Sequence, residues 1–200
     1  MNSYCWSKGE LIQPPVPILL CSMFLMSSYD QPVSMAVALL LLRLVLGLYM
    51  AAHGAQKLFG WFGGYGLDAT GQFFTQIGYR QGKVFAFLAS VTEVVSGVLV
   101  TLGLLGPVGP AMMVAVMIVA AVTVHWKGGM FSANNGIELN VLFAVGAVLL
   151  GLIGYGRYSL DAMFGVDLHV TPRLALATLG FGVVGGVINL LIRRPPSAAS

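Results

Sequence analysis

Five long, continuous apolar segments dominate this chain. Each is close to the ~20 residues that an α-helix needs to cross the ~30 Å hydrocarbon core of a bilayer. The segments do not alternate between apolar and polar residues, and a helix satisfies its own backbone in lipid, so strands are disfavoured. They cover roughly residues 34–52, 84–105, 108–126, 137–155 and 174–192. The sequence therefore predicts an all-α transmembrane helical bundle, with four core helices and a fifth, C-terminal helix.

The composition excludes a soluble domain. Hydrophobic residues make up 58% of the 200 residues and charged residues only 8%, with a mean hydropathy of +0.88. Soluble domains carry about 25% charged residues, because their surface must be polar. The net charge of +3 is too small and too scattered for nucleic-acid binding. The expected partner is the lipid bilayer.

The two cysteines limit the redox chemistry that the chain itself can perform. Cys5 and Cys21 both precede the first apolar segment, and no CxxC motif is present. A redox role would therefore use a cofactor, a quinone or a partner protein rather than a dithiol of this chain.

Three regions follow from the pattern. Residues 1–33 form an N-terminal extension, interpreted as partly disordered or not native, 34–170 a four-helix membrane domain, and 171–200 the C-terminal helix with a short basic tail. The apolar stretch Leu11–Met26 is short, contains three prolines and lacks a basic start and a cleavage site, so it is a poor signal peptide. The pattern allows four, five or six membrane spans.

Basic residues are distributed unequally between the two ends of the predicted helices. With five alternating helices, one end carries six basic residues and the other carries three. Lys and Arg accumulate on the cytoplasmic side of membrane proteins, so the richer end is predicted to lie in the cytoplasm. The richer end holds Lys57, Arg80, Lys83, Lys127, Arg193 and Arg194; the other holds Lys8, Arg157 and Arg173.

Two charged residues fall inside the predicted membrane segments. Arg43 and Glu93 each lie about nine residues into their helix, at similar depths by a rise of ~1.5 Å per residue. A charge at that depth costs at least ~2.5–3.5 kcal/mol and normally has a partner, so we pair Arg43 with Glu93. Two roles are open. The pair either fixes helix packing, or Glu93 relays protons or binds a polar headgroup while Arg43 holds its charge.

A second polar cluster is predicted at one end of the bundle. His53 ends the first helix, His125 ends the third and Glu138 begins the fourth, so all three lie at the same end, together with Gln56 and Lys57. A His–Glu cluster beside a membrane cavity is suited to proton exchange with a quinone. The alternative for Glu138 is a capping box over Asn135. No metal site is predicted, since the ligands would come from three separate helices.

These residues carry a family resemblance. The first-helix sequences Arg43-Leu-Val-Leu-Gly47 and His53-Gly-Ala-Gln-Lys-Leu-Phe-Gly60 resemble the signature of the DoxX/DoxD family. Glu93 with Gly97, His125, and Asn135-Gly-Ile-Glu138 also fit that pattern, over roughly Met35–Asp167. The extension and the fifth segment depart from it.

The resemblance implies a small bundle, typically of four helices, in the bacterial inner membrane. It also implies a place in membrane redox systems, since similar proteins are named as subunits of thiosulfate:quinone oxidoreductase or of membrane oxidoreductase assemblies. Many members have no established activity, so the resemblance does not deliver a reaction.

The leading hypothesis from the sequence is a component of a quinone-linked membrane oxidoreductase system, with a soluble or membrane oxidoreductase as partner. The glycine- and aromatic-rich segment 59–66 would help to line the entrance. Alternatives are a non-enzymatic scaffold that recruits a soluble redox enzyme, or a small-solute or proton permease. A homo-oligomer is left open. The candidate catalytic residues are Glu93, His125 and His53, and the candidate quinone-binding residues are Arg43, Lys57, Gln56 and Glu138.

Overall fold

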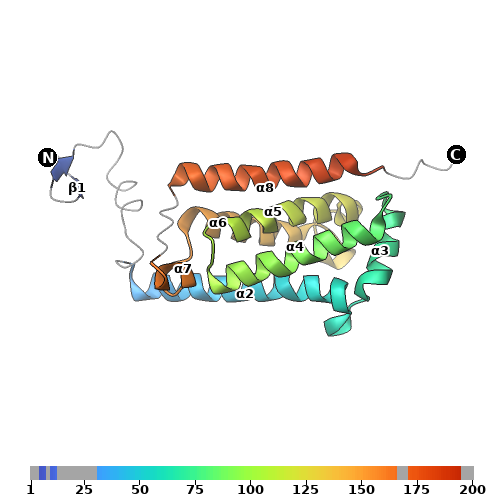
Figure 1. The fold of residues 1–200 in the computed structure, drawn as a ribbon, viewed down its shortest axis with the longest axis horizontal. Helices are drawn as coiled ribbons and strands as arrows, with labels where there is room; N and C mark the ends of the chain where they lie inside the picture. The colour runs from blue at the N-terminus through green and yellow to red at the C-terminus, as the bar shows by residue number, and fades with distance from the viewer. Residues whose placement is uncertain (1–4, 8–9, 13–30, 166–170, 195–200) are drawn as a thin grey trace.

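Five long helices run alternately in opposite directions through one elongated bundle (Figure 1). The structure, a computed structural model, describes residues 5–7, 10–12, 31–165 and 171–194. The predicted all-α bundle is confirmed. Its long helices are α2 (Val33–Phe59), α4 (Gly82–Leu102), α5 (Val108–Ala120), α6 (Glu138–Ile153) and α8 (Pro172–Ile192).

Four of the helical segments are long and apolar enough to cross a membrane. They are α2, α4, α8 and the segment Val108–Gly128, which continues α5. The fourth predicted segment forms α6, which has only 16 residues and spans about 24 Å. It ends because Gly154, at φ 87°, leaves the helical conformation. The chain is a multi-pass membrane protein, and whether α6 also spans remains a prediction.

Glycines bring α2 and α4 into close contact. A Cβ atom added to Gly97 would lie 2.5 Å from the Gly47 carbonyl oxygen, and one added to Gly54 would lie 2.6 Å from the Ser90 carbonyl oxygen. Helices in lipid associate by such small-residue packing, because apolar side chains gain little by leaving the lipid. Ser90 and Gly97 therefore lie on the face of α4 that packs against α2.

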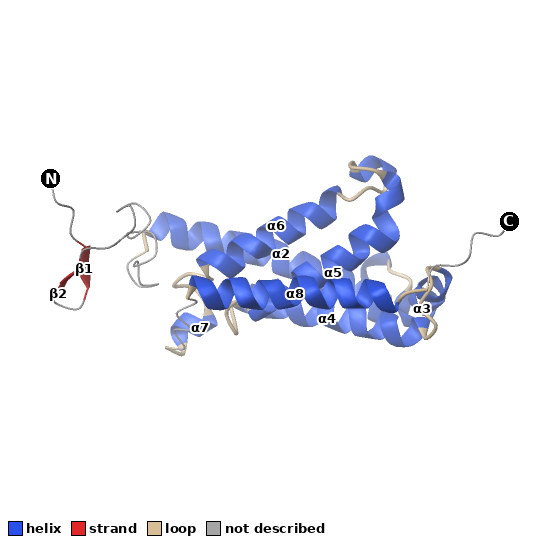
Figure 2. Cartoon of the chain, turned by 90° about the horizontal axis from the view of Figure 1, so that it is seen from above, coloured by secondary structure: helices blue, strands red, loops and turns tan. Residues whose placement is uncertain are grey.

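The apolar core lies where α2, α4, α5 and α6 meet. Met50, Val100, Met113 and Leu150 belong to one cluster and are each at most 1% exposed. Helix α8 packs on the outside of this group, against α5 (Figure 2). A Cβ atom on Gly182 would lie 2.3 Å from the Ala111 carbonyl oxygen, so the glycines of α8 allow its close approach.

The link between α2 and α4 is structured. Helix α2 ends at Gly60, whose φ of 73° is left-handed, and a short 3-10 turn, η1 (Trp61–Gly63), follows. Helix α3 (Gly66–Gln76) then packs against α4 at one end of the bundle (Figure 1). Helix α3 was not predicted from the sequence.

Short elements complete the described chain. Helix α5 passes into a π-helical turn, η2 (Ala121–His125); the others are the 3-10 turns η3 (Trp126–Gly128) and η4 (Ser132–Asn134), helix α7 (Leu160–Met163), and the antiparallel strands β1 (Cys5–Ser7) and β2 (Glu10–Ile12). The strands belong to the predicted N-terminal extension, most of which lies outside the described residues, as does Cys21.

The two predicted sets of basic residues lie at opposite ends of the bundle, one set at each end. Lys8 lies outside the described residues. At the richer end, the Arg193 guanidinium donates to the Ile77 carbonyl and the Arg194 N–H donates to the Gly78 carbonyl. These bonds attach the C-terminal end of α8 to the link between α3 and α4.

Candidate functional site

An ion pair between Lys57 and Glu93 joins the last turn of α2 to the middle of α4. The Lys57 Nζ atom contacts Glu93 Oε1. The Glu93 side chain is 3% exposed and that of Lys57 is 32% exposed, so a buried carboxylate is held by a partly accessible ammonium group. Within the described chain, Glu93 Oε2 is buried and has no hydrogen-bond partner.

The predicted pairing of Arg43 with Glu93 is wrong. The contacts of Gly97 with Gly47 and of Ser90 with Gly54 fix how α2 and α4 align, and this alignment sets Gly103 opposite Arg43. The depth estimate assumed that the first helix ends near residue 52. Because α2 continues to Phe59, that end of the helix lies about 10 Å further along the axis, which brings Lys57 within reach of Glu93.

Arg43 is instead buried at the other end of the bundle. It is 1% exposed, and its Nη2 donates to the Tyr158 carbonyl oxygen at 2.7 Å. Its guanidinium lies 5.8 Å from the centre of the Tyr155 ring and against Gly103, which ends α4. The C-terminal end of a helix carries partial negative charge, so this position favours a cation.

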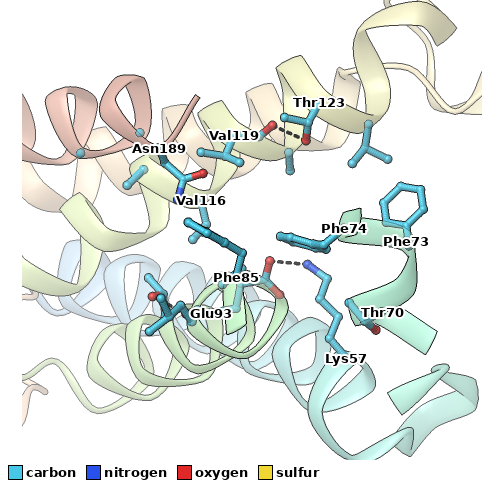
Figure 3. A pocket seen from close by; sticks show the side chains of 18 of the residues that line it. Lys57, Thr70, Phe73, Phe74, Phe85, Glu93, Val116, Val119, Thr123 and Asn189 are labelled. Carbon is cyan, nitrogen blue, oxygen red and sulfur yellow. Dashed lines mark hydrogen bonds and ion pairs between the residues drawn. The ribbon is translucent and has the colours of Figure 1, made fainter. Parts of the chain in front are cut away.

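A cavity of about 400 Å³ opens beside the ion pair. Lys57 and Glu93 form part of its wall, and the aromatic rings of Phe74 and Phe85 lie next to them (Figure 3). Most of the remaining wall is apolar. It comes from α3, α4, α5 with its π-helical turn, and α8, and includes Thr70, Phe73, Leu88, Ala89, Thr92, Val116, Val119, Thr123, Val124, Gly185 and Gly186.

The three threonine hydroxyls of the wall donate to carbonyls of their own helices, and two further polar side chains line the cavity. His125 Nδ1 lies 3.0 Å from the Asn135 carbonyl oxygen, and because a carbonyl can only accept, Nδ1 carries the proton. With the proton on Nδ1, the neutral form of the ring has Nε2 as its acceptor. On α8, Asn189 Oδ1 accepts a 2.6 Å hydrogen bond from the Tyr79 hydroxyl. Burial raises the pKa of Tyr79, although Arg193 opposes this, so the phenol keeps its proton at neutral pH.

The other predicted site residues lie away from the cavity. His53 Nδ1 contacts Gln56 Oε1 at 3.2 Å, and its ring packs edge-on against Phe143. Gln56 Nε2 donates to the Phe62 carbonyl, so these two residues hold the segment after α2. The structure thus unites Lys57, Glu93 and His125, but not His53, Gln56, Arg43 or Glu138.

Glu138 stabilises the loop before α6. Its Oε2 accepts hydrogen bonds from the Ser132 N–H at 2.9 Å and from the Ser132 hydroxyl at 2.7 Å. The predicted capping box over Asn135 is therefore wrong. The N-cap residue of α6 is Ile137, which makes no side-chain cap bond, and Glu138 bonds to Ser132 instead. Asn135 has a left-handed φ of 59°, which turns the chain before the helix begins.

Sequence reasoning missed the walls that α3 and α8 contribute. The predicted entrance segment 59–66 does not line the cavity; Thr70, Phe73 and Phe74 of α3 do. The apolar residues of α3 have helical spacing, but the neighbouring glycines and aromatic residues made the segment resemble a loop. For α8 the sequence offered two signals: its glycine-rich face, and Asn189, which is the one amide in the C-terminal apolar segment.

Residues 38–126 match the family model of DoxX. This match supports membership of the DoxX family. The DoxX segment contains α2, α3, α4 and α5 with the π-helical turn, and thus Lys57, Glu93 and His125. No curated protein and no solved structure matches the chain. Helix α8, which supplies one wall of the cavity, lies outside the DoxX segment.

The described residues of this DoxX protein contain no group of three or more His, Cys, Asp or Glu side chains that could hold a metal ion. The polar groups of the cavity are instead one carboxylate, one ammonium, one imidazole, one amide and three threonine hydroxyls. This set can donate and accept hydrogen bonds and can exchange protons, within a wall that is otherwise suited to an apolar ring.

Proposed function

We propose that this DoxX protein is a component of a quinone-linked oxidoreductase system in the bacterial inner membrane, and that its cavity binds the quinone head. The observation that carries the proposal is the Lys57–Glu93 pair in the wall of an apolar cavity within the membrane domain. Ionisable residues inside membrane segments are costly and generally mark functional sites.

The chemistry of the cavity suits a quinone ring. Lys57 Nζ can donate to a ring carbonyl, and the rings of Phe74 and Phe85 offer apolar surfaces beside it. Reduction of a quinone to a quinol takes up two electrons and two protons. In the proposed system the electrons come from a partner oxidoreductase and the two protons from water. The Glu93 carboxylate and His125 Nε2 each take up one proton and pass it to one of the two ring oxygens.

The unpartnered oxygen of Glu93 supports this role. Buried polar atoms are nearly always hydrogen-bonded, so a buried carboxylate oxygen without a partner calls for an explanation. A proton on Glu93 that is transferred to and from a bound quinone provides one. A carboxylate used only to hold two helices together would be expected to have both oxygens satisfied.

Binding of a labelled quinone analogue to the purified protein in nanodiscs tests the proposal. We expect the double variant Glu93→Gln/His125→Ala to lose most of the binding, because both proton-exchanging groups are removed from the wall. The matched control is Asp68→Asn/His53→Ala, which changes an exposed carboxylate and a histidine outside the cavity. Unchanged binding in the first variant would refute the site.

The exposed basic end favours a second candidate function, a scaffold that recruits a soluble redox enzyme. Lys83 and Asp68 form an exposed ion pair there, beside the exposed Arg80 and the C-terminal Arg194. In this case a redox enzyme would co-purify with the protein, and its association would survive Glu93→Gln but not charge reversal at Arg80 and Lys83.

A further inference from the structure

Two exposed residues of the cavity wall lie in membrane-spanning helices. Leu88 of α4 lines the cavity and is 53% exposed, and Gly185 of α8 lines it and is also exposed. Both residues lie in helices long and apolar enough to span the membrane. Their exposed faces therefore meet lipid rather than water.

Gly185 differs from its neighbours on α8. A Cβ atom on Gly182 would lie 2.3 Å from the Ala111 carbonyl oxygen, and one on Gly186 would lie 3.0 Å from the Ala115 carbonyl oxygen. A Cβ atom on Gly185 would meet nothing within 4 Å. Close packing on α5 thus explains two of the glycines, whereas the third keeps a space open at the rim of the cavity.

Helix α8 is fixed at the end nearest this space. The Tyr79–Asn189 hydrogen bond and the bond from Arg193 to the Ile77 carbonyl attach it to the link between α3 and α4. The opening beside Gly185 is therefore held by bonds on the α3 side and by glycine packing on the α5 side. It is a built feature of the fold.

The size of the cavity limits what it can enclose. About 400 Å³ lies near the lower end of the ~300–1,000 Å³ range of small-molecule pockets, which accommodates a ring but not a long chain as well. A ligand whose polar head contacts the Lys57–Glu93 pair, and which carries a long apolar tail, must extend that tail out of the cavity. The exposed rim between Leu88 and Gly185 is the route toward lipid.

We infer that the gap between Leu88 and Gly185 is a lateral portal, and that the ligand of the cavity is a lipid-soluble molecule whose apolar tail leaves through it. The inference rests on the proposed function for the head of the ligand. It assigns to α8, which lies outside the DoxX segment, the selection of tailed over tail-less ligands.

The test compares a decyl-substituted ubiquinone with the same ring without a chain, both bound to the protein in nanodiscs. The affinity advantage of the decyl probe is the ratio of its affinity to that of the ring without a chain. We expect Gly185→Leu to lower this ratio about tenfold, because the new side chain displaces several methylene groups from the portal. Gly180→Leu is the matched control, since a Cβ atom there also meets nothing within 4 Å and residue 180 does not line the cavity. Partition of the decyl probe into lipid cancels when variants are compared.

A second pair of variants tests the opposite rim. Leu88→Trp should lower the same advantage, whereas Phe87→Trp, on an exposed position of α4 outside the cavity, should not. If both rim variants keep the full advantage of the decyl probe, or weaken both probes equally, the portal is refuted while quinone binding stands. If the unsubstituted protein binds neither probe, the portal and the proposed function fail together.

Discussion

Lys57 is the charged partner of the buried Glu93 carboxylate. The carboxylate is almost fully buried, and in the described chain its only ion-pair partner is an ammonium group that remains about one-third exposed. Removing one member of a buried pair leaves an uncompensated charge, which costs more than the pair itself contributes. Lys57 therefore contributes to the stability of the α2–α4 interface.

A double-mutant cycle measures the coupling between Lys57 and Glu93. Lys57→Met should lower the free energy of unfolding by about 1–3 kcal/mol, less than for a fully buried pair because water screens Lys57. Lys57→Met combined with Glu93→Gln should lose clearly less than the sum of the single changes. The cycle is read from thermal unfolding in nanodiscs, and additive effects would contradict the pairing.

The same measurement separates the observed pair from the one expected from sequence. Arg43→Met and Glu93→Gln should be additive within about 0.5 kcal/mol, because Arg43 lies against Gly103 and contacts neither oxygen of Glu93. A coupling energy as large as that of Lys57 with Glu93 would show that the two charges sense each other.

The sequence was sufficient to select the buried charges but not to pair them. Arg43 and Glu93 stand out because charges are rare in apolar segments. To pair two charges on different helices, one must know where each helix ends. Hydropathy does not show whether residues 53–59 are helix or loop. Lys57 and His125 were predicted as site residues from the end at which they lie, whereas the positions of His53 and Gln56 depend on local contacts that no sequence pattern records.

At the level of elements, the α2–α4 interface should not tolerate even one added methyl group. Gly97→Ala would place a Cβ atom 2.5 Å from the Ala51 nitrogen and from the Gly47 carbonyl oxygen, both backbone atoms. Overpacking of this kind costs about 1–3 kcal/mol. Thermal unfolding should show this loss for Gly97→Ala, while Gly180→Ala, with open space around it, should be neutral or slightly stabilising. Equal stability of the two variants would contradict the packing.

Hydropathy predicted the long helices because their physics is local: a continuous apolar segment of sufficient length must be helical in lipid. It did not predict α3 or the π-helical turn. Helix α3 is polar enough to resemble a loop and is helical because Phe74 packs with Tyr79 and Phe85. The π-helical turn places Thr123, Val124 and His125 along the cavity, and such turns are frequent at functional sites.

The whole molecule is polarised along its long axis. One end carries the ion pair, the cavity, α3 and six basic residues, while the other carries Arg43, Arg157 and Arg173 among the described residues. The cavity therefore lies at the same end of the bundle as the excess of basic residues. A site that exchanges protons and contacts a redox partner would be reached from the side on which the basic residues lie.

The positive-inside rule predicts that this basic end faces the cytoplasm. After replacement of Cys5 and Cys21, single cysteines at Phe131 and Met163 report on the two ends, since these side chains are 67% and 68% exposed in loops or short turns. In intact cells a membrane-impermeant maleimide should label Met163→Cys, whereas Phe131→Cys should react only after the membrane is permeabilised. The reverse pattern would place the cavity toward the outside. Under the proposed function, proton exchange and partner binding would then occur on the opposite face, and only an oxidoreductase on that face could serve as the partner.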